Sequence, residues 1–332
     1  MLSHLRLPVL APALALALAL PLAGCAADAD DDQESSGSSS AVEIQNCGHT
    51  VTVEAPPERV VLVNNDPVAN LEALGAIDRV VAITADLQEG LYDDATYDAL
   101  GSLELLSTET NATGGSVVSQ EALLGAAPDL VIAPENAVDR AALERAGIPL
   151  YVPTAYCNDP GPELSETATF DRVWTEVRDL GTILGESERA DEVVADGEAE
   201  LAAETAPDAG TAVALYVSSG GSVLSPYGGP SMVTPVFEAA GLTNVYADSD
   251  ERVFDVNVED VLSRDPGTIV LLYSGGDPQE TLDAFASAPG VDDLDAVRDG
   301  RVVALPFSYT DPPSVLSLQG PAQLRELLAG LG

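Results

Sequence analysis

The sequence predicts an α/β fold in which two lobes with mostly parallel sheets are joined by a single long linker helix. Short apolar runs alternate with helical patterns along the chain, as buried parallel strands alternate with the helices that connect them. This alternation occurs twice, and the longest helical pattern lies between the two series. We therefore place the lobes of the 332-residue chain at 41–168 and 207–332, and the linker helix at 169–206.

The first lobe contains strand-like runs of Val, Ile and Leu, each bounded by turn residues. Such runs favour buried parallel strands. We expect strands at 59–64, 79–84, 129–133 and 149–152. We expect helices between them at 67–74, 119–126 and 136–146. Ser119 stands at the N-cap position of the second of these helices. Residues 85–118 form a long, irregular stretch.

The linker pattern repeats apolar residues at three- and four-residue steps, which is typical of an amphipathic helix. Gly181, Gly185 and Gly197 weaken it, so a kink or a break is the alternative to one continuous helix. The second lobe repeats the order of the first. Its expected strands are 211–218, 244–247, 268–273 and 301–305, and its expected helices are 231–240, 258–264, 278–287 and 313–331.

Two local matches between the halves suggest an internal repeat. Glu121 and Glu259 are each followed seven residues later by Pro, directly before a predicted strand. The segments 71–75 and 237–241 also match, since each places Glu before a closing Gly and is followed by a Val-containing strand. Acidic helix starts and Pro before strands are common in α/β proteins, so a single match could arise by chance. Two matches in the same order are stronger evidence of a repeat than one.

The amino-terminal segment indicates export. Arg6 precedes an apolar run rich in Ala and Leu, and the run ends in Leu-Ala-Gly before Cys25. Prolines interrupt the run, and its length suits a signal peptide better than a spanning helix. The end of the run resembles the bacterial lipoprotein box, in which the Cys is lipidated. Residues 1–25 are thus predicted to be a lipoprotein signal peptide, and the acidic, Ser-rich residues 26–40 a disordered tether.

The charge of the chain is extreme. It has 55 acidic and 13 basic residues, a formal net charge of −42, and every basic residue is Arg. Nucleic acid is excluded as a partner because phosphate binding needs a basic patch. Adaptation to a salty environment or an acidic proteome is the simplest explanation. The charge should still repel strongly anionic ligands at long range.

The cysteines suggest one disulfide. With Cys25 lipidated, Cys47 and Cys157 remain, and an exported protein sits where disulfides persist, so we predict that they are bonded. The alternative is a catalytic Cys157 assisted by His49, but nothing nearby supplies a third, orienting group. A phosphate-binding loop is excluded because the sequence has no Lys, and no G-x-S-x-G motif of a hydrolase is present.

From 51 to 331 the chain resembles the substrate-binding lipoproteins of ABC importers for ferric siderophores, haem and cobalamin, the class III periplasmic binding proteins. The resemblance rests on the segments 57–61, 74–80, 121–133 and 259–273 and on the linker pattern. The Asn-Cys-Gly start at 46–48 with the later Cys157 is similar to a branch common in high-GC Gram-positive bacteria.

The resemblance implies two Rossmann-like lobes and a monomer anchored by lipid on the outer face of the cell membrane. It implies an ABC permease with its ATPase as partners. It also implies that Glu121 and Glu259, one per lobe, dock on permease Arg residues, although both acids could simply stabilise their helices.

The ligand is expected between the lobes, at the carboxyl ends of the parallel strands. Tyr is prominent there, and it combines apolar contact with a hydroxyl group. The candidate ligand-binding residues are Asn65, Tyr92, Glu135, Tyr156, Ser218, Tyr227, Arg252, Tyr273 and Tyr309. Arg252 could instead form a surface ion pair with Asp248 or Asp250.

One cation in the cleft argues against triply anionic ferric catecholates and favours a neutral or cationic complex such as a ferric hydroxamate. Cobalamin is the next candidate, and haem with a Tyr axial ligand the third. We expect no cofactor and no bare metal site, since such sites use several His or Cys. An enzyme, such as a secreted hydrolase, and an adhesion or signalling module are the alternatives of other classes.

Overall fold

The computed structural model describes residues 41–103, 105–107, 109–110, 115–203, 206–217 and 223–331. The predicted signal peptide with Cys25, the predicted tether, and Ser218 lie outside the described residues. Within the described ranges, no helix has both the length and the apolar character that crossing a membrane requires.

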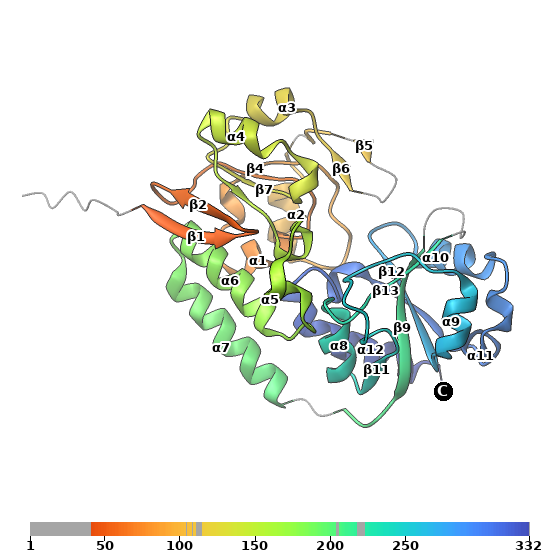
Figure 1. The fold of residues 1–332 in the computed structure, drawn as a ribbon. Helices are drawn as coiled ribbons and strands as arrows, with labels where there is room; N and C mark the ends of the chain where they lie inside the picture. Colours follow the sequence, from red (N-terminus) through yellow and green to blue (C-terminus); the bar gives the residue numbers. More distant parts are fainter. Residues whose placement is uncertain are drawn as a thin grey trace, which may run out of the picture. The chain divides into compact units, whose positions relative to one another are not determined.

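The first lobe is built on a four-stranded parallel sheet, as predicted (Figure 1). Its strands, in spatial order, are β4 (Val80–Ile83), β3 (Val60–Leu62), β7 (Leu130–Ile132) and β8 (Leu150–Tyr151). Its helices are α1 (Val68–Ala73), α2 (Asp94–Leu100), α3 (Gln120–Gly125), α4 (Arg140–Ala146) and α5 (Gly161–Ser165). Alternate residues of β3 pack on opposite sides: Leu62 lies in the core with α1, and Val61 in the core with α3 and α4.

Two antiparallel hairpins add to this lobe, and neither is among the predicted elements. One pairs β1 (Val42–Asn46) with β2 (His49–Val53), and the other pairs β5 (Glu109–Thr110) with β6 (Ser116–Val117). Cys47 and Gly48 both have positive φ, which makes the tight turn of the first hairpin. Helix 136–146 begins later than predicted, at Arg140, because the Asp139 side chain caps it at Ala142 N.

The predicted linker helix is two helices, α6 (Asp171–Leu184) and α7 (Ser187–Ala203). Gly185 ends α6 with a φ of 74°, a left-handed conformation that favours glycine. The helices then pack antiparallel, so that an added Cβ at Gly181 would meet Ala190, and one at Gly197 would meet Trp174. The single helix that leads from the first lobe to the second is therefore α7 alone (Figure 1).

The second lobe has the strand order β10-β9-β12-β13, with β11 also paired to β9. Its strands are β9 (Gly210–Val217), β10 (Leu224–Pro226), β11 (Leu242–Asn244), β12 (Thr268–Tyr273) and β13 (Val302–Pro306). Its helices are α8 (Val233–Ala239), α9 (Val258–Arg264), α10 (Pro278–Ala286), α11 (Asp295–Arg298) and α12 (Leu316–Ala329). The strand expected at 244–247 lies two to three residues earlier in the chain, as β11. It ends at Asn244, whose Oδ1 accepts a hydrogen bond from Tyr246 N.

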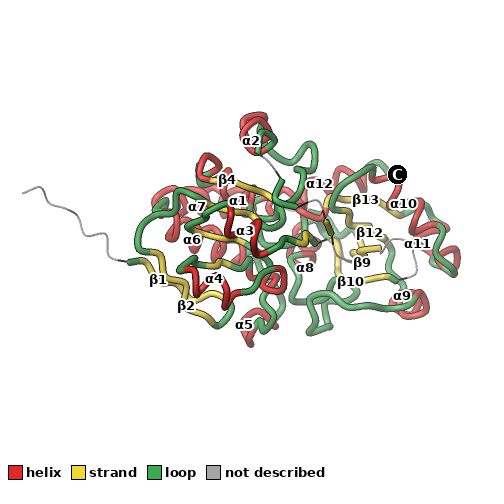
Figure 2. The backbone as a smooth tube through the Cα atoms, turned by 90° about the horizontal axis from the view of Figure 1, so that it is seen from above, coloured by secondary structure: helices red, strands yellow, loops and turns green. Residues whose placement is uncertain are grey.

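Helices cover both faces of this sheet (Figure 2). Val270 and Leu272 pack in the core with α8 and α12, whereas Ile269 and Leu271 pack in the core with α9 and α10. The parallel strands β11, β9, β12 and β13 repeat the order of β4, β3, β7 and β8. The shared order gives structural support to the internal repeat that the sequence suggested.

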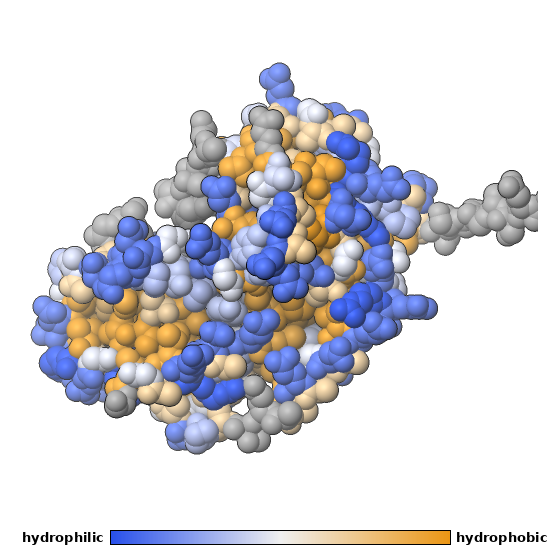
Figure 3. All heavy atoms as spheres, turned by 180° about the vertical axis from the view of Figure 1, so that it is seen from behind, coloured by the Kyte–Doolittle hydropathy of each residue, from blue (hydrophilic) through white to orange (hydrophobic). Residues whose placement is uncertain are grey.

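Hydrophilic and apolar side chains occupy different parts of the surface. On the face shown in Figure 3, hydrophilic side chains occupy the projecting parts and apolar side chains lie between them. Among the described residues, Val117 is the single large hydrophobic side chain that is exposed.

Candidate functional site: a cavity between two sheet edges

A cavity of about 460 Å³ lies where the carboxyl ends of the strands of both lobes meet. Its lining comes from the segments that directly follow β3, β4, β7 and β8 in the first lobe and β12 and β13 in the second. Tyr216 of β9, β10 and the chain after β11 complete the described lining of the second lobe. Polar members of the lining include Asn64, Asn65, Asp66, Asp86, Gln88, Ser116, Asn136, Ser225, Asp255, Ser274 and Ser308. The position agrees with the rule for open parallel sheets.

Five of the candidate ligand residues line this cavity: Asn65, Tyr92, Tyr156, Tyr227 and Arg252. They come from both lobes and from elements far apart in the sequence. The candidate Ser218 lies outside the described residues. The remaining three candidates, Glu135, Tyr273 and Tyr309, are not part of the cavity lining.

For Glu135 and Tyr309, contacts explain why they lie outside the lining. Glu135 accepts hydrogen bonds from Arg140 (3.2 Å) and from Asn158 N (2.7 Å), and lies 3.7 Å from His49 Nε2. Tyr309 is buried in the core shared with α8 and α12. Tyr273 ends β12, and the next residue, Ser274, lines the cavity in its place.

Several lining residues had escaped the sequence interpretation, among them Tyr216, Phe254 and Asp255. Tyr216 lies one residue before the carboxyl end of β9, in a strand that the sequence predicted. Its position near that end was the signal that could have identified it as a lining residue. Phe254 and Asp255 belong to a segment that pairs with β10, where Leu224 bridges Val256 and Tyr227 bridges Val253. That antiparallel pairing left no recognisable sequence pattern.

The wall of the first lobe is organised around Asn65 and Tyr92. Asn65 Nδ2 donates to Asp86 O at 2.7 Å, while its buried Oδ1 has no hydrogen-bond partner among the described residues. Tyr92 packs beside Tyr97, with ring centroids 5.7 Å apart. The Tyr97 hydroxyl donates to Gln88 O at 2.7 Å and accepts from Leu91 N at 2.9 Å, so it fixes the loop that presents Tyr92.

A charged cluster joins the two walls. Arg252 of the second lobe forms an ion pair with Asp311, and its guanidinium carbon lies 5.5 Å from the ring centroid of Tyr156 in the first lobe. Asp311 is 1% exposed and also accepts hydrogen bonds from Ser231 Oγ (3.3 Å) and Met232 N (3.1 Å). The charge of Asp311 is therefore balanced by Arg252 and by hydrogen bonds within the protein, without solvent.

Asp66 is the acidic group on the opposite wall. Burial raises its pKa to about 6, although a hydrogen bond from the Tyr156 hydroxyl acts in the opposite direction. Burial, followed by the charge of Asp66, raises the pKa of Tyr92 and of Tyr156, so both phenols stay protonated at neutral pH. The cavity thus offers hydroxyl donors, amide groups and carboxylates, and one guanidinium whose charge is balanced.

Glu121 and Glu259 occupy equivalent places in the two lobes. Each is the second residue of a short helix, α3 or α9, between the second and third parallel strands, and each side chain is exposed. The helices are capped alike: Ser119 Oγ accepts from Ala122 N at 3.1 Å, and Asn257 Oδ1 accepts from Asp260 N at 2.9 Å.

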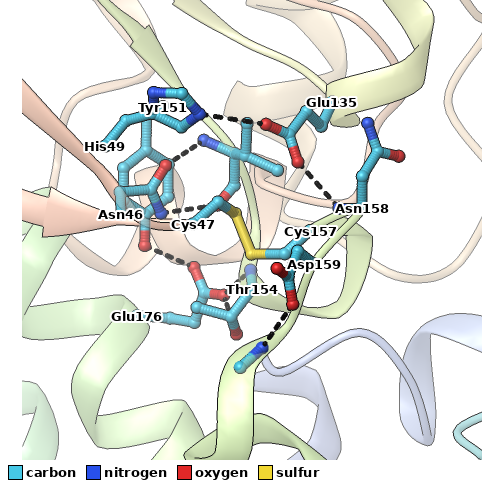
Figure 4. Close-up of a disulfide and its surroundings, with 12 residues drawn as sticks. Asn46, Cys47, His49, Glu135, Tyr151, Thr154, Cys157, Asn158, Asp159 and Glu176 are labelled. Atoms are coloured by element: carbon cyan, nitrogen blue, oxygen red, sulfur yellow. Dashed lines mark hydrogen bonds and ion pairs between the residues drawn. A yellow bond between two sulfur atoms is a disulfide. The ribbon is translucent and has the colours of Figure 1, made fainter.

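The predicted disulfide between Cys47 and Cys157 is present, with the two Cα atoms 5.2 Å apart (Figure 4). A bonded Cys157 has no thiol, which removes the alternative of a nucleophilic Cys157 with His49. His49 instead lies near Glu135. Within the described residues, no group of three or more His, Cys, Asp or Glu is arranged to hold a metal ion.

Comparison with known proteins gives a consistent result. Residues 60–309 match the family model described as periplasmic binding protein. The cobalamin-binding protein of Halobacterium salinarum is 28% identical over 279 residues, which cover 80% of this chain and 67% of that protein.

Among solved structures, one of an ABC-type Fe3+-hydroxamate transport system from Saccharomonospora viridis is 37% identical, with a TM-score of 0.79, covering 86% of this chain and 98% of that one. The periplasmic vitamin B12 binding protein of Vibrio cholerae is 19% identical with a TM-score of 0.54, covering 83% and 98%, and shares the fold.

Proposed function

Since the chain belongs to the periplasmic binding protein family, we propose that it captures a ferric siderophore of the hydroxamate type in the cavity and delivers it to an ABC permease. The charge of the cavity carries this proposal. Among the described residues, the lining contains three carboxylates, Asp66, Asp86 and Asp255, and one cation, Arg252, which is already paired with Asp311. A ligand bearing several negative charges would meet no unbalanced positive group in this described part of the lining.

Ferric trihydroxamates suit such a cavity because three singly charged hydroxamates balance Fe3+, which leaves a neutral core. Any further amino group makes the complex cationic. The oxygen-rich surface of the complex accepts hydrogen bonds from the protonated hydroxyls of Tyr92 and Tyr227, while the Tyr156 hydroxyl donates to Asp66 and its ring offers apolar contact. Asn65 Oδ1, a buried acceptor without a partner among the described residues, suits an amide or ammonium donor of the ligand. The similarity to a hydroxamate-system protein at 37% identity supports the same choice.

Cobalamin is the second candidate, favoured by the cobalamin-binding relative at 28% identity. It too lacks a large negative charge. Haem is less well supported, because a Tyr axial ligand binds ferric iron as a phenolate. Burial and the carboxylate of Asp66 raise the pKa of Tyr92 and Tyr156, which opposes that form.

Delivery is proposed to use Glu121 and Glu259 as docking groups for permease Arg residues. Both carboxylates are exposed at capped helix starts, in equivalent positions of the two lobes. Paired contacts would let the permease engage both lobes at once. Lipidation of Cys25, with residues 26–40 as a tether, is proposed to hold the protein at the outer face of the membrane.

The proposal is tested by thermal unfolding of residues 41–332 with ferrioxamine B, a ferric catecholate, cyanocobalamin and haem. At one hundred times Kd, a bound ligand raises the free energy of unfolding by about 2.7 kcal/mol. We expect this with ferrioxamine B. Stabilisation by cyanocobalamin alone would transfer the function to cobalamin uptake, and preferential binding of the catecholate would refute the charge argument.

A further inference from the structure

Tyr156 lies on a short loop that has side-chain anchors on both sides. The loop follows β8 and contains the turn Thr154–Tyr156 and then Cys157. Its anchors come from outside the loop: the β1–β2 hairpin, helix α6 and the segment after β7. Tyr156 is the loop residue that lines the cavity, beneath the guanidinium of Arg252.

The side of the loop before Tyr156 is fixed by two buried polar side chains (Figure 4). Asn46 forms a reciprocal pair with the backbone of Val152: Nδ2 donates to its carbonyl and Oδ1 accepts from its amide, both at 2.8 Å. Glu176 accepts from Thr154 N at 2.5 Å and from Thr154 Oγ1 at 2.6 Å. Asn46 is 3% and Glu176 1% exposed, so water does not compete for these bonds.

The side after Tyr156 is fixed by a covalent bond and one charged group. Cys157, the next residue, is bonded to Cys47 at the tip of the hairpin. Asn158 N donates to Glu135 Oε2 at 2.7 Å, and Arg140 holds the other oxygen of Glu135. Glu135, a candidate ligand residue in the sequence, thus contributes to the loop rather than to the cavity lining.

Two adjacent residues of the β1–β2 hairpin anchor the loop on both sides of Tyr156. Asn46 and Cys47 are adjacent, and they hold residues on both sides of Tyr156 at sequence separations of 106 and 110. The hairpin also precedes the part of the chain that matches the family model, which begins at residue 60. Its contacts therefore extend the site beyond the region that defines the family.

We propose that Asn46, the Cys47–Cys157 disulfide and Glu176 are positioning residues for ligand binding, which act by holding Tyr156 in the cavity wall. The inference rests on the proposed function only in assuming that the ligand contacts Tyr156. An unanchored loop must be ordered when the ligand binds, and immobilising one flexible side chain weakens binding by about 2- to 10-fold. The same loss of order speeds amide exchange in the free protein.

A double-mutant cycle on the oxidised protein tests this with ferrioxamine B as the probe. We expect Cys47→Ser with Cys157→Ser, and separately Asn46→Ala, to raise Kd by about 2- to 10-fold when Tyr156 is present. In the Tyr156→Ala background the same changes should alter Kd by less than roughly twofold. An equal loss of affinity in both backgrounds would mean that the anchors only stabilise the lobe, and would overturn the proposal.

Hydrogen–deuterium exchange provides a readout that does not depend on the ligand. Breaking the disulfide should speed exchange at residues 152–159 in the free protein, and unchanged exchange there would overturn the proposal even if the protein binds ferrioxamine B. Accelerated exchange in a protein that binds none of the tested ligands would support the anchoring and refute the proposed function alone. Arg79→Gln is the matched control: Arg79 joins Leu184 O and Glu186 at the α6–α7 turn, so its loss should leave exchange at 152–159 unaltered.

Discussion

Glu176 gives the folded protein a pH dependence that one substitution can isolate. Its carboxyl group is 1% exposed and accepts from the Tyr151 hydroxyl at 2.7 Å and from Thr154. Burial is the main reason why its pKa is raised from 4.5 to about 7, with the hydrogen bonds from Thr154 and Tyr151 acting the other way. Asp179, on the same helix, adds a smaller increase.

The sign of the effect follows from proton binding. Between pH 4.5 and about 7, the folded protein keeps the proton on Glu176 while the unfolded chain has released it. The contribution of Glu176 to stability is therefore complete below pH 4.5 and is lost as the pH rises through the folded pKa. Each pH unit of this window is worth about 1.4 kcal/mol, so the full effect is about 3.5 kcal/mol.

Glu176→Gln imitates the protonated acid and should remove this dependence. We expect the free energy of unfolding of the variant, relative to wild type, to increase by up to about 3.5 kcal/mol between pH 4.5 and 7.5. Urea titrations followed by the fluorescence of Trp174, the single Trp, measure it at each pH. Asp66, whose pKa burial raises to about 6, is present in both proteins and cancels in the difference. Asp179, whose pKa burial also raises to about 6, cancels except for its small charge coupling to Glu176.

Glu163→Gln, an exposed carboxyl in the same lobe, is the matched control. Its curve should run parallel to that of wild type. If the curve of Glu176→Gln also ran parallel, the carboxyl would be ionised throughout the range, and the argument from burial would be wrong.

Three further predictions concern the cavity, the docking surface and the linker. Asp311→Asn leaves the charge of Arg252 unbalanced, so catecholate complexes should bind about tenfold more tightly relative to hydroxamate complexes than they do in wild type. Fluorescence quenching measures both Kd values. Glu121→Arg with Glu259→Arg should leave Kd within about twofold and abolish uptake of radiolabelled ligand by cells. Gly185→Ala should lower the free energy of unfolding, measured by urea titration, by about 1 kcal/mol, because Gly185 has a left-handed φ of 74° that strains a residue with a Cβ.

Each of these has an outcome that contradicts it. An unchanged Kd ratio for Asp311→Asn would show that Arg252 does not face the ligand. Glu144→Arg with Glu280→Arg, the same charge change at exposed sites on other helices, should preserve uptake, and uptake lost equally by both pairs would point to net charge rather than docking. A neutral Gly185→Ala would mean that the α6–α7 turn relaxes without strain.

The regular elements of the parallel sheets could be predicted because their burial dictates their composition. The run at 268–273 is β12 without a change of boundary, since all but its last residue are buried between helices. Ser119 was predicted as a cap from its chemistry alone, and its Oγ accepts from Ala122 N. The break at Gly185 was harder to predict. A glycine lowers helix propensity whether the helix continues or breaks, and the antiparallel pair α6–α7 is favoured by the packing of Ala190 against Gly181, which the sequence does not reveal.

The site was predicted less completely, since a side chain at a strand end can turn to either side. Tyr156 and Glu135 follow neighbouring strands, yet Tyr156 lines the cavity and Glu135 turns to Arg140 and Asn158. Nothing in the local sequence distinguishes them, because the difference lies in partners distant in the chain. The strand-end rule identified the region, and long-range contacts selected the residues.

The two lobes hold their cavity residues by different means, although their sheets share one order of strands. In the first lobe Tyr156 is held by a disulfide and by the buried side chains of Asn46, from the same lobe, and of Glu176, from α6. In the second lobe Arg252 is held by the buried Asp311, which Ser231 and Met232 N also bind. Both walls are therefore fixed before a ligand arrives, and binding need not order them again. Selectivity should then depend on the charge balance that these fixed groups present, and this is why changing Asp311, which does not line the cavity, is expected to change which complex is bound.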